Sequence, residues 1–162
     1  MIDFDKLQID IIKDSANINT YVWWKYYCYQ GGKILFSPRK ATTLFVMPSD
    51  ECKLLLQRVA DRYEALRDFF QHISSPEEMS QYKKLVILGT VKPYAQEVMY
   101  KLIDEGRNFY VYLFPKWLKY TDLMNVEIYG KDSESPVIIK HNGDIVQIVA
   151  PLRINYTWGV MI

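Results

Sequence analysis

The sequence is poor in cysteine, in histidine and in long apolar runs, and each shortage excludes a class of protein. Its two cysteines, Cys28 and Cys52, fall in different predicted elements without CxxC spacing, so we expect two reduced, buried thiols rather than a disulfide framework. The two histidines, His72 and His141, have no HxxxH or HExxH partner, which argues against a zinc site. The longest uncharged apolar runs, such as residues 85–91, are much shorter than the roughly 18–20 residues of a membrane span. The sequence therefore predicts no metal site and no contact with a membrane.

The common catalytic motifs are missing as well. GxGxxG, GxxxxGKS/T and GxSxG do not occur, which removes the usual sequence grounds for dinucleotide binding, P-loop nucleotide binding and serine hydrolysis. The acids form no convincing catalytic pair, because Glu77 and Glu78 start a predicted helix and Asp132 and Glu134 lie in the polar turn GKDSES. We expect no catalytic residue and no cofactor, although an enzyme of unfamiliar geometry stays open.

What is present is the composition of one folded domain. The chain has 162 residues, 49% of them hydrophobic and 24% charged, so we expect a single domain over residues 1–162. The net charge of +1 gives no overall attraction to nucleic acid or anionic lipid. The N-terminus carries acids early and lacks the pattern of a secretory signal, so we expect a cytoplasmic protein.

Aromatic residues dominate one stretch, in which six of the nine residues from 21 to 29 are aromatic. Gly31 and Gly32 favour a turn after it, so we predict a β-hairpin of residues 20–29 and 33–36, with a helix over residues 17–30 as the alternative. Strand alternation places Trp24 on the core face with Val22, Tyr26 and Cys28. The opposite face would then carry Tyr21, Trp23, Lys25, Tyr27 and Tyr29.

This second face has two interpretations. It is either covered by another layer, with the lysine reaching solvent along its stem, or it is an exposed aromatic and cationic surface for a protein partner or stacked bases. The sequence does not decide between them.

The middle of the chain predicts alternating strands and helices. Residues 41–48 indicate a buried strand, and the apolar spacing from Asp50 to Ile73 indicates a long helix. A short helix begins at Pro76 with Ser75 as its N-cap. Residues 84–90 and 108–114 are predicted strands on either side of a predicted helix over residues 92–106. Together they predict an α/β fold with a parallel βαβαβ layer.

The two ends of the chain are read differently. Residues 4–15 fit either a strand or a helix. After residue 125 four short β-rich runs are separated by turn signals, and HNGD at residues 141–144 is typical of a type I′ hairpin turn. We therefore expect the parallel layer to carry an N-terminal aromatic hairpin and a C-terminal antiparallel β extension.

The order KKLVILGT, PYAQEVMYKLIDEGRNFYVYLFP, VEIYG and SPVIIKHNGDIVQIVAP resembles the second half of a phospholipase D-like domain, over about half of the chain. The resemblance is one of pattern. Where that family has the histidine and lysine of its HxK motif this chain has Ser135 and Val137, and Asn142 takes the place of the aspartate. The resemblance therefore implies a non-catalytic relative, the alternative being a generic α/β layer.

Loops after parallel strands gather at one edge of a sheet, where ligands bind. In the predicted fold that edge would form a lysine-bearing, anion-binding rim of Ser49, Thr90, Lys92, Lys116 and Trp117. Two functions stay open: a non-catalytic interaction or assembly module that uses its aromatic surface for a protein partner or self-association, and a nucleic-acid or phosphate-ligand protein that uses the rim.

Overall fold

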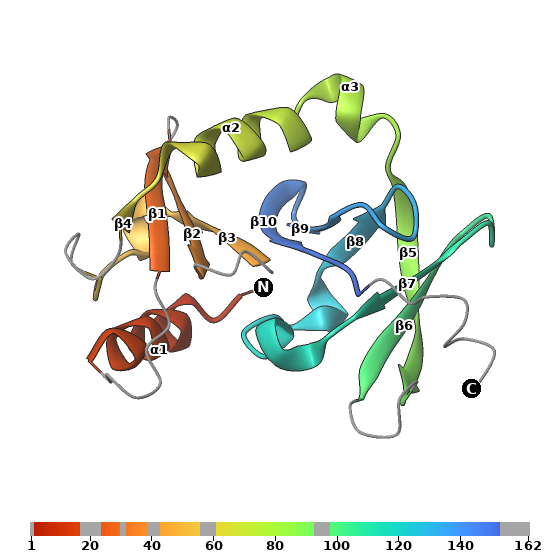
Figure 1. The fold of residues 1–162 in the computed structure, drawn as a ribbon, viewed down its shortest axis with the longest axis horizontal. Helices are drawn as coiled ribbons and strands as arrows, with labels where there is room; N and C mark the ends of the chain where they lie inside the picture. Colours follow the sequence, from red (N-terminus) through yellow and green to blue (C-terminus); the bar gives the residue numbers. More distant parts are fainter. Residues whose placement is uncertain are drawn as a thin grey trace.

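Ten strands form one continuous sheet in a computed structural model that describes residues 2–16, 24–29, 32–38, 43–55, 61–92 and 98–152. Their order across the sheet is β4-β1-β2-β3-β10-β9-β8-β5-β6-β7 (Figure 1). The strands are β1 (Trp24–Tyr29), β2 (Lys33–Pro38), β3 (Thr43–Pro48), β4 (Asp61–Arg62), β5 (Lys83–Val91), β6 (Met99–Asp104), β7 (Tyr110–Leu113), β8 (Glu127–Gly130), β9 (Val137–His141) and β10 (Asp144–Val149).

The sheet consists of three antiparallel meanders joined edge to edge. They are β1-β2-β3, β10-β9-β8 and β5-β6-β7, and the joints are the antiparallel pairs β3–β10 and β8–β5. Among the described strands only the two-residue pairing of β4 with β1 is parallel. The last two strands in the sequence, β9 and β10, therefore lie at the centre of the sheet.

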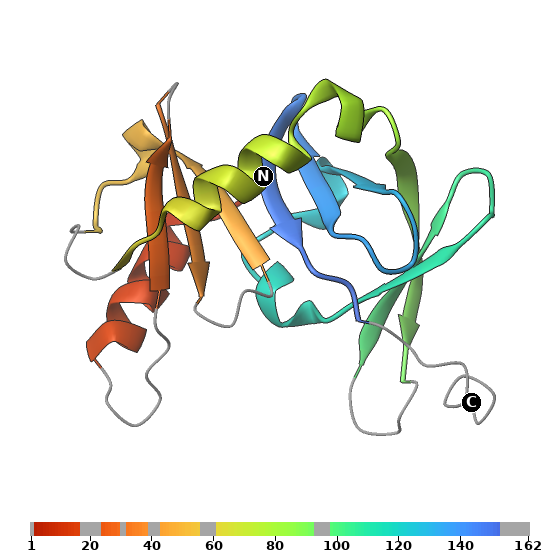
Figure 2. The same ribbon diagram turned by 45° about the horizontal axis from the view of Figure 1, so that its top comes forward.

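Two helices cover opposite faces of the first meander (Figures 1 and 2). On one face α1 (Phe4–Ala16) buries Leu7 and Ile11 against Trp24, Phe36 and Phe45. Neighbouring residues of the same strands point the other way, and α2 (Glu64–Ile73) buries its apolar stripe of Leu66, Phe70 and Ile73 against Leu35, Leu44 and Val46.

The other two meanders curl around a core of their own. It contains nine buried side chains, among them Leu102 of β6, Val111 of β7 and Val137 and Ile139 of β9. Ile138, between the last two, packs in the cluster beneath α2, so β9 is buried on both faces. The backbone N–H of Leu152 donates to the Tyr112 carbonyl (2.8 Å), which ties the segment after β10 to the edge of β7.

The predicted parallel α/β layer is wrong. β5, β6 and β7 pair in antiparallel fashion, and the described part of the predicted helix over residues 92–106 is the strand β6. Met99 and Leu102 are both buried although they point to opposite faces of the strand, so their spacing of three imitated a helical stripe. With antiparallel strands the chain is a β-rich protein.

The long helix predicted from Asp50 is also wrong in its first part. Residues Ser49–Glu51 form a single 3-10 turn, and regular helix begins only at Glu64. Gln8 explains the difference, because its buried side chain accepts hydrogen bonds from the N–H groups of Leu54 (2.9 Å) and Leu55 (3.4 Å). Tertiary contacts therefore hold these residues out of a helix despite their spacing.

Several local predictions are confirmed. β1 and β2 form the aromatic hairpin, which excludes the alternative helix over residues 24–29. The predicted short helix is α3 (Pro76–Met79), and its N-cap Ser75 accepts at Oγ from the Glu78 N–H (3.3 Å). The segment of residues 4–15, which fitted either a strand or a helix, is helical. The C-terminal runs form antiparallel strands, with a two-residue turn between β9 and β10. The predicted run at residues 153–158 lies outside the described residues.

Two further findings concern the apolar segments and the cysteines. None of the described helices is both long and apolar enough to cross a bilayer. Both thiols are free, yet Cys28 is exposed and Cys52 half-buried, so the prediction of two buried thiols is wrong for Cys28. Cys28 stands where β1 runs out from under α1, which explains why its strand face is not covered there.

Candidate functional site

The core face of the aromatic strand is as predicted at Trp24. This side chain is 2% exposed, and its ring meets that of Trp117 edge to face with centroids 5.8 Å apart. Its Nε1 donates to Asp14 of α1 (3.4 Å), so the indole has both apolar contacts and a polar partner. Trp24 is therefore a structural residue that joins β1, α1 and the segment after β7.

The opposite face of this strand is partly covered. Lys25 and Tyr27 are half-buried: the Lys25 ammonium lies 5.0 Å from the Tyr63 ring centre, and the Arg67 guanidinium lies 5.6 Å from that of Tyr27. Tyr63 and Arg67 belong to the start of α2. At these two positions the face is a contact with α2 rather than a free surface. Tyr21, Trp23 and the side chain of Tyr29 lie outside the described residues.

The predicted anion-binding rim loses its structural basis. Ser49 follows β3, Thr90 and Lys92 lie at the end of β5, and three other strands separate β3 from β5 in the sheet. Lys116 and Trp117 lie together in the 3-10 turn η3 (Pro115–Leu118), with the ammonium 5.1 Å from the indole. β3, β5 and β7 run in the same direction, yet the intervening strands spread their ends along the edge of the sheet, so the sheet does not gather these five residues at one point.

A different surface stands out on β5-β6-β7. Val86, Ile103 and Tyr110 are paired neighbours across the three strands, so their side chains lie in one row on the face opposite Leu102 and Val111; Met99, on the same face at the start of β6, is buried. Val86 is 48% exposed and Tyr110 is 45% exposed. Lys101, two residues before Ile103 on the same face, holds its ammonium 4.4 Å from the Tyr110 ring centre. We call Val86, Lys101, Ile103 and Tyr110 the outer face.

A groove of about 890 Å³ lies on another part of the molecule. Four stretches of the chain line it: the start of α1, the start of β2 with the end of β3 that it pairs with, residues 119–122, and the β9–β10 turn. Asp3 N–H donates to the Tyr120 carbonyl (2.7 Å), which fixes the start of α1 to residues 119–122. The volume is that of an ordinary ligand pocket.

Carboxylates and apolar side chains share the lining of this groove. Asp3 and Asp122 are occupied in capping, since they accept from the N–H groups of Lys6 (3.1 Å) and Met124 (3.2 Å) respectively. For the side-chain carboxylates of three others the described residues offer no hydrogen bond or ion pair. These acids are Asp5, Glu51 and Asp144.

The apolar part of the lining and its polar neighbours are fixed. Ile2, Phe4, Ile145 and Val146 are buried or half-buried there. Tyr120 donates its hydroxyl to Asp10 (2.7 Å); burial above all, and then this carboxylate, raise the pKa of the phenol, so it stays protonated. The groove thus places carboxylates without a partner among the described residues beside a buried apolar floor, which suits a ligand that is both cationic and apolar.

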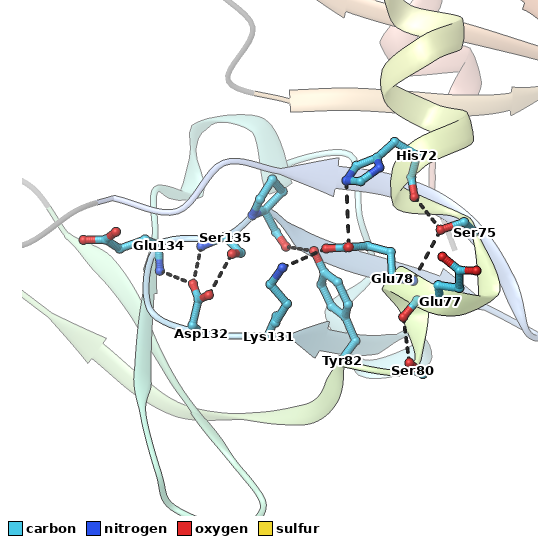
Figure 3. Close-up of polar contacts among 11 residues, drawn as sticks. His72, Ser75, Glu77, Glu78, Ser80, Tyr82, Lys131, Asp132, Glu134 and Ser135 are labelled. Carbon is cyan, nitrogen blue, oxygen red and sulfur yellow. Dashed lines mark hydrogen bonds and ion pairs between the residues drawn. The ribbon is translucent and has the colours of Figure 1, made fainter.

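A third group of polar residues lies where α3 meets the turn between β8 and β9 (Figure 3). The Glu78 carboxylate accepts from the Lys131 ammonium (2.8 Å) and lies 3.8 Å from Nε2 of His72. The hydrogen bond from Lys131 is the main reason that the pKa of Glu78 lies below its ordinary value. Tyr82 donates to the Pro136 carbonyl (3.1 Å), and burial, followed by the charges of nearby acids, raises its pKa to about 12.

This group has the contacts of a structural clamp. Figure 3 shows that its hydroxyls are engaged with backbone or carboxylate acceptors: Ser75 with the His72 carbonyl (2.8 Å), Ser80 with the Glu77 carbonyl (2.6 Å) and Ser135 with Asp132 (2.9 Å). In the part of the chain that the structure describes, no hydroxyl or thiol has a histidine ring as its hydrogen-bond partner, and no three His, Cys, Asp or Glu side chains are arranged to hold a metal. The clamp pins α3 to the sheet.

Comparisons with known proteins identify no relative of this chain. No family model, curated protein or solved structure matches the chain. The resemblance to phospholipase D-like domains stays a prediction.

Sequence reasoning missed both surfaces for identifiable reasons. The outer face was missed because residues 99–104 were interpreted as part of a helix. The spacing of two between Lys101 and Ile103 was a sequence signal for a strand, and the strand pairs Ile103 with Tyr110. The groove requires the long-range pairing of β3 with β10, which no local pattern reveals. The HNGD turn was the only local signal that placed one of its walls, at His141 to Asp144.

Proposed function

We propose that this protein is a non-catalytic assembly module whose copies associate through the outer face of the β5-β6-β7 meander. One observation supports the proposal above the others: the row Val86, Ile103 and Tyr110 crosses three strands while its first and last members keep nearly half of their surface exposed. Continuous apolar rows of this kind on a protein surface commonly mark interaction sites.

Two further observations favour a second copy of this chain as the partner. Lysine accompanies the apolar row, and the acidic groove of the same chain presents the opposite charge beside apolar side chains. Tyrosine is also enriched at interface hot spots. The alternative of a phosphate-binding rim depended on parallel strands, so we do not propose it.

Sedimentation velocity over a wide range of protein concentration tests the proposal. We expect the wild type to form larger species as concentration rises, and Tyr110→Ala to weaken that association by about 2 kcal/mol or more, which is roughly 30-fold in the association constant. Its thermal melt should change little, because exposed positions usually alter stability by about 0.5 kcal/mol or less.

Phe69→Ala is the matched control, since Phe69 is an aromatic residue of similar exposure (40%) on α2. It should leave association unchanged. A wild type that stays monomeric at all concentrations would contradict the proposal, and so would equal weakening by both substitutions. If nucleic acid co-purifies with the protein, the purified sample shows the ultraviolet absorbance of bases. That result would favour a nucleic-acid partner instead.

A further inference from the structure

We infer that the copies assemble head to tail, with the β6–β7 turn and the outer face of one copy docked in the acidic groove of the next. This inference rests on the proposed function and adds the arrangement of the copies. The juxtaposition that carries it is a basic meander, β5-β6-β7, whose projecting turn carries Arg107, and an acidic groove in a different part of the same chain.

The inserted element is a rigid turn. Asp104, fully buried at the end of β6, accepts hydrogen bonds from the N–H groups of Asn108 (2.6 Å) and Phe109 (3.0 Å) and from the Asn108 side chain (3.2 Å). Arg107 N–H donates to the Asp104 carbonyl (2.9 Å) and has a φ of +58°, so it is held in the left-handed region. The turn needs little further ordering to bind, which reduces the entropic cost of association.

This turn projects from the body of the molecule. Figures 1 and 2 both show the connection between β6 and β7 extending beyond the rest of the sheet, at the right of the view. Arg107 is exposed there, and Tyr110 and Val86 of the outer face lie directly behind it. An arginine in front of an apolar row is well suited to a pocket that combines carboxylates with apolar side chains.

The charges of the two surfaces are opposite. Residues 83–92 and 98–113, the described part of this meander and its turns, contain five basic and two acidic side chains, and one of the two acids is the buried Asp104. The groove is lined by five acidic and two basic side chains. Because the whole chain has a net charge of only +1, this separation of charge is local, and it favours contact between unlike surfaces of two copies.

Such a contact does not close on itself. The inserted turn belongs to the terminal strands β6 and β7 of the sheet, whereas the groove lies at the start of α1 and at the β9–β10 turn. A bound pair therefore still presents one unused turn and one unused groove. A heterologous contact of this type produces rings or open filaments rather than a symmetric dimer.

Two half-blocked variants test the arrangement. Arg107→Glu/Lys101→Glu reverses two positive charges of the turn and the outer face and leaves the groove intact, and Asp5→Asn/Asp144→Asn removes two negative charges from the groove and leaves the turn intact. We expect each variant alone to associate at least about 10-fold more weakly than the wild type. An equimolar mixture should form a 1:1 dimer and nothing larger, because one working turn meets one working groove.

The controls change charge elsewhere on exposed positions. Lys13→Glu on α1 and Glu77→Gln on α3 should leave assembly unchanged, and Arg107→Lys, which keeps the positive charge, should retain it in large part. Thermal melts confirm that each variant is folded. Association of the wild type should weaken as salt is raised, since exposed charges are screened.

The outcomes separate the two proposals. A monomeric wild type overturns the proposed function and this inference together. A wild type that assembles while both half-blocked variants assemble equally well overturns only the head-to-tail arrangement. A mixture of the two variants that forms no 1:1 dimer would also overturn the head-to-tail arrangement, because a symmetric interface predicts that the mixture forms no such dimer.

Discussion

Gln147 is a buried amide whose polar atoms all have partners. Its Oε1 accepts from the Thr121 hydroxyl (2.7 Å), and its Nε2 donates to the Thr43 hydroxyl (3.0 Å) and to the Trp117 carbonyl (2.9 Å). The residue is fully buried in β10, at the joint between the first two meanders. A satisfied network of this kind fixes one arrangement of the segments that meet there.

Replacement of Gln147 should be costly for that reason. In Gln147→Leu the Thr121 hydroxyl and the Trp117 carbonyl lose their partner, and each buried unsatisfied group costs roughly 1–3 kcal/mol. Urea denaturation should show this loss in the free energy of unfolding. The double variant Gln147→Leu/Thr121→Val should recover part of the lost stability, because the second substitution removes the Thr121 hydroxyl that the first leaves without a partner. A double variant less stable than the single one would contradict this account.

At the scale of the element, the β9–β10 hairpin depends on its turn. Asn142 and Gly143 have φ values of +50° and +83°, and a Cβ built on Gly143 would meet nothing within 4 Å. Gly143→Ala should therefore destabilise the protein through backbone strain alone, by roughly 1–2 kcal/mol in the free energy of unfolding. Gly143→Asn should lose less, because asparagine tolerates the left-handed region. Equal losses in thermal or urea melts would count against strain as the cause.

Elements with local signals were predictable from the sequence. The two glycines before Lys33 and the HNGD turn indicated both hairpins, and Ser75 followed by Pro76 indicated α3. In each case the physical cause is a turn or a cap within a few residues of the element itself. The same locality explains why Trp24 was placed correctly in the core.

Elements defined by distant contacts were not predictable. β6 has buried residues on both faces, so its apolar spacing carried no period of two. Residues 54 and 55 are held by the Gln8 side chain of α1, more than forty residues earlier in the chain. Neither fact can be seen without knowing what packs against these segments. The candidate surfaces depend on the same contacts, which is why the outer face and the groove were missed.

At the scale of the whole molecule, the described carboxyl groups make stability sensitive to acid. Asp10 is a clear case: the hydrogen bond from Tyr120 lowers its pKa most, partial burial opposes the shift, and the neighbouring Lys119 adds to it. This pair also fastens α1 to the segment between β7 and β8. The pKa is lowered as well in Glu78, Asp104, Asp122 and Asp132.

A carboxyl group with a lowered pKa stabilises the folded state only while it is ionised. Its contribution is complete above its unfolded pKa of about 4 and is lost as pH falls through the lower folded value. We therefore expect the free energy of unfolding to fall below about pH 4. Asp10→Asn should be less stable than the wild type at neutral pH, and urea denaturation at a series of pH values should show the difference narrowing in acid. A difference that does not change with pH would refute the assignment.

The position of β10 has a consequence for synthesis on the ribosome. This strand is the last one described along the chain, yet it pairs with β3 on one side and β9 on the other. β3 is almost entirely apolar and buried, so a nascent chain carries it with an unpaired edge until β10 has emerged. Unpaired apolar edges invite association with other chains, and pairing across so long a stretch of sequence is slow. A nascent chain stalled before residue 144 should therefore need a chaperone to stay unaggregated.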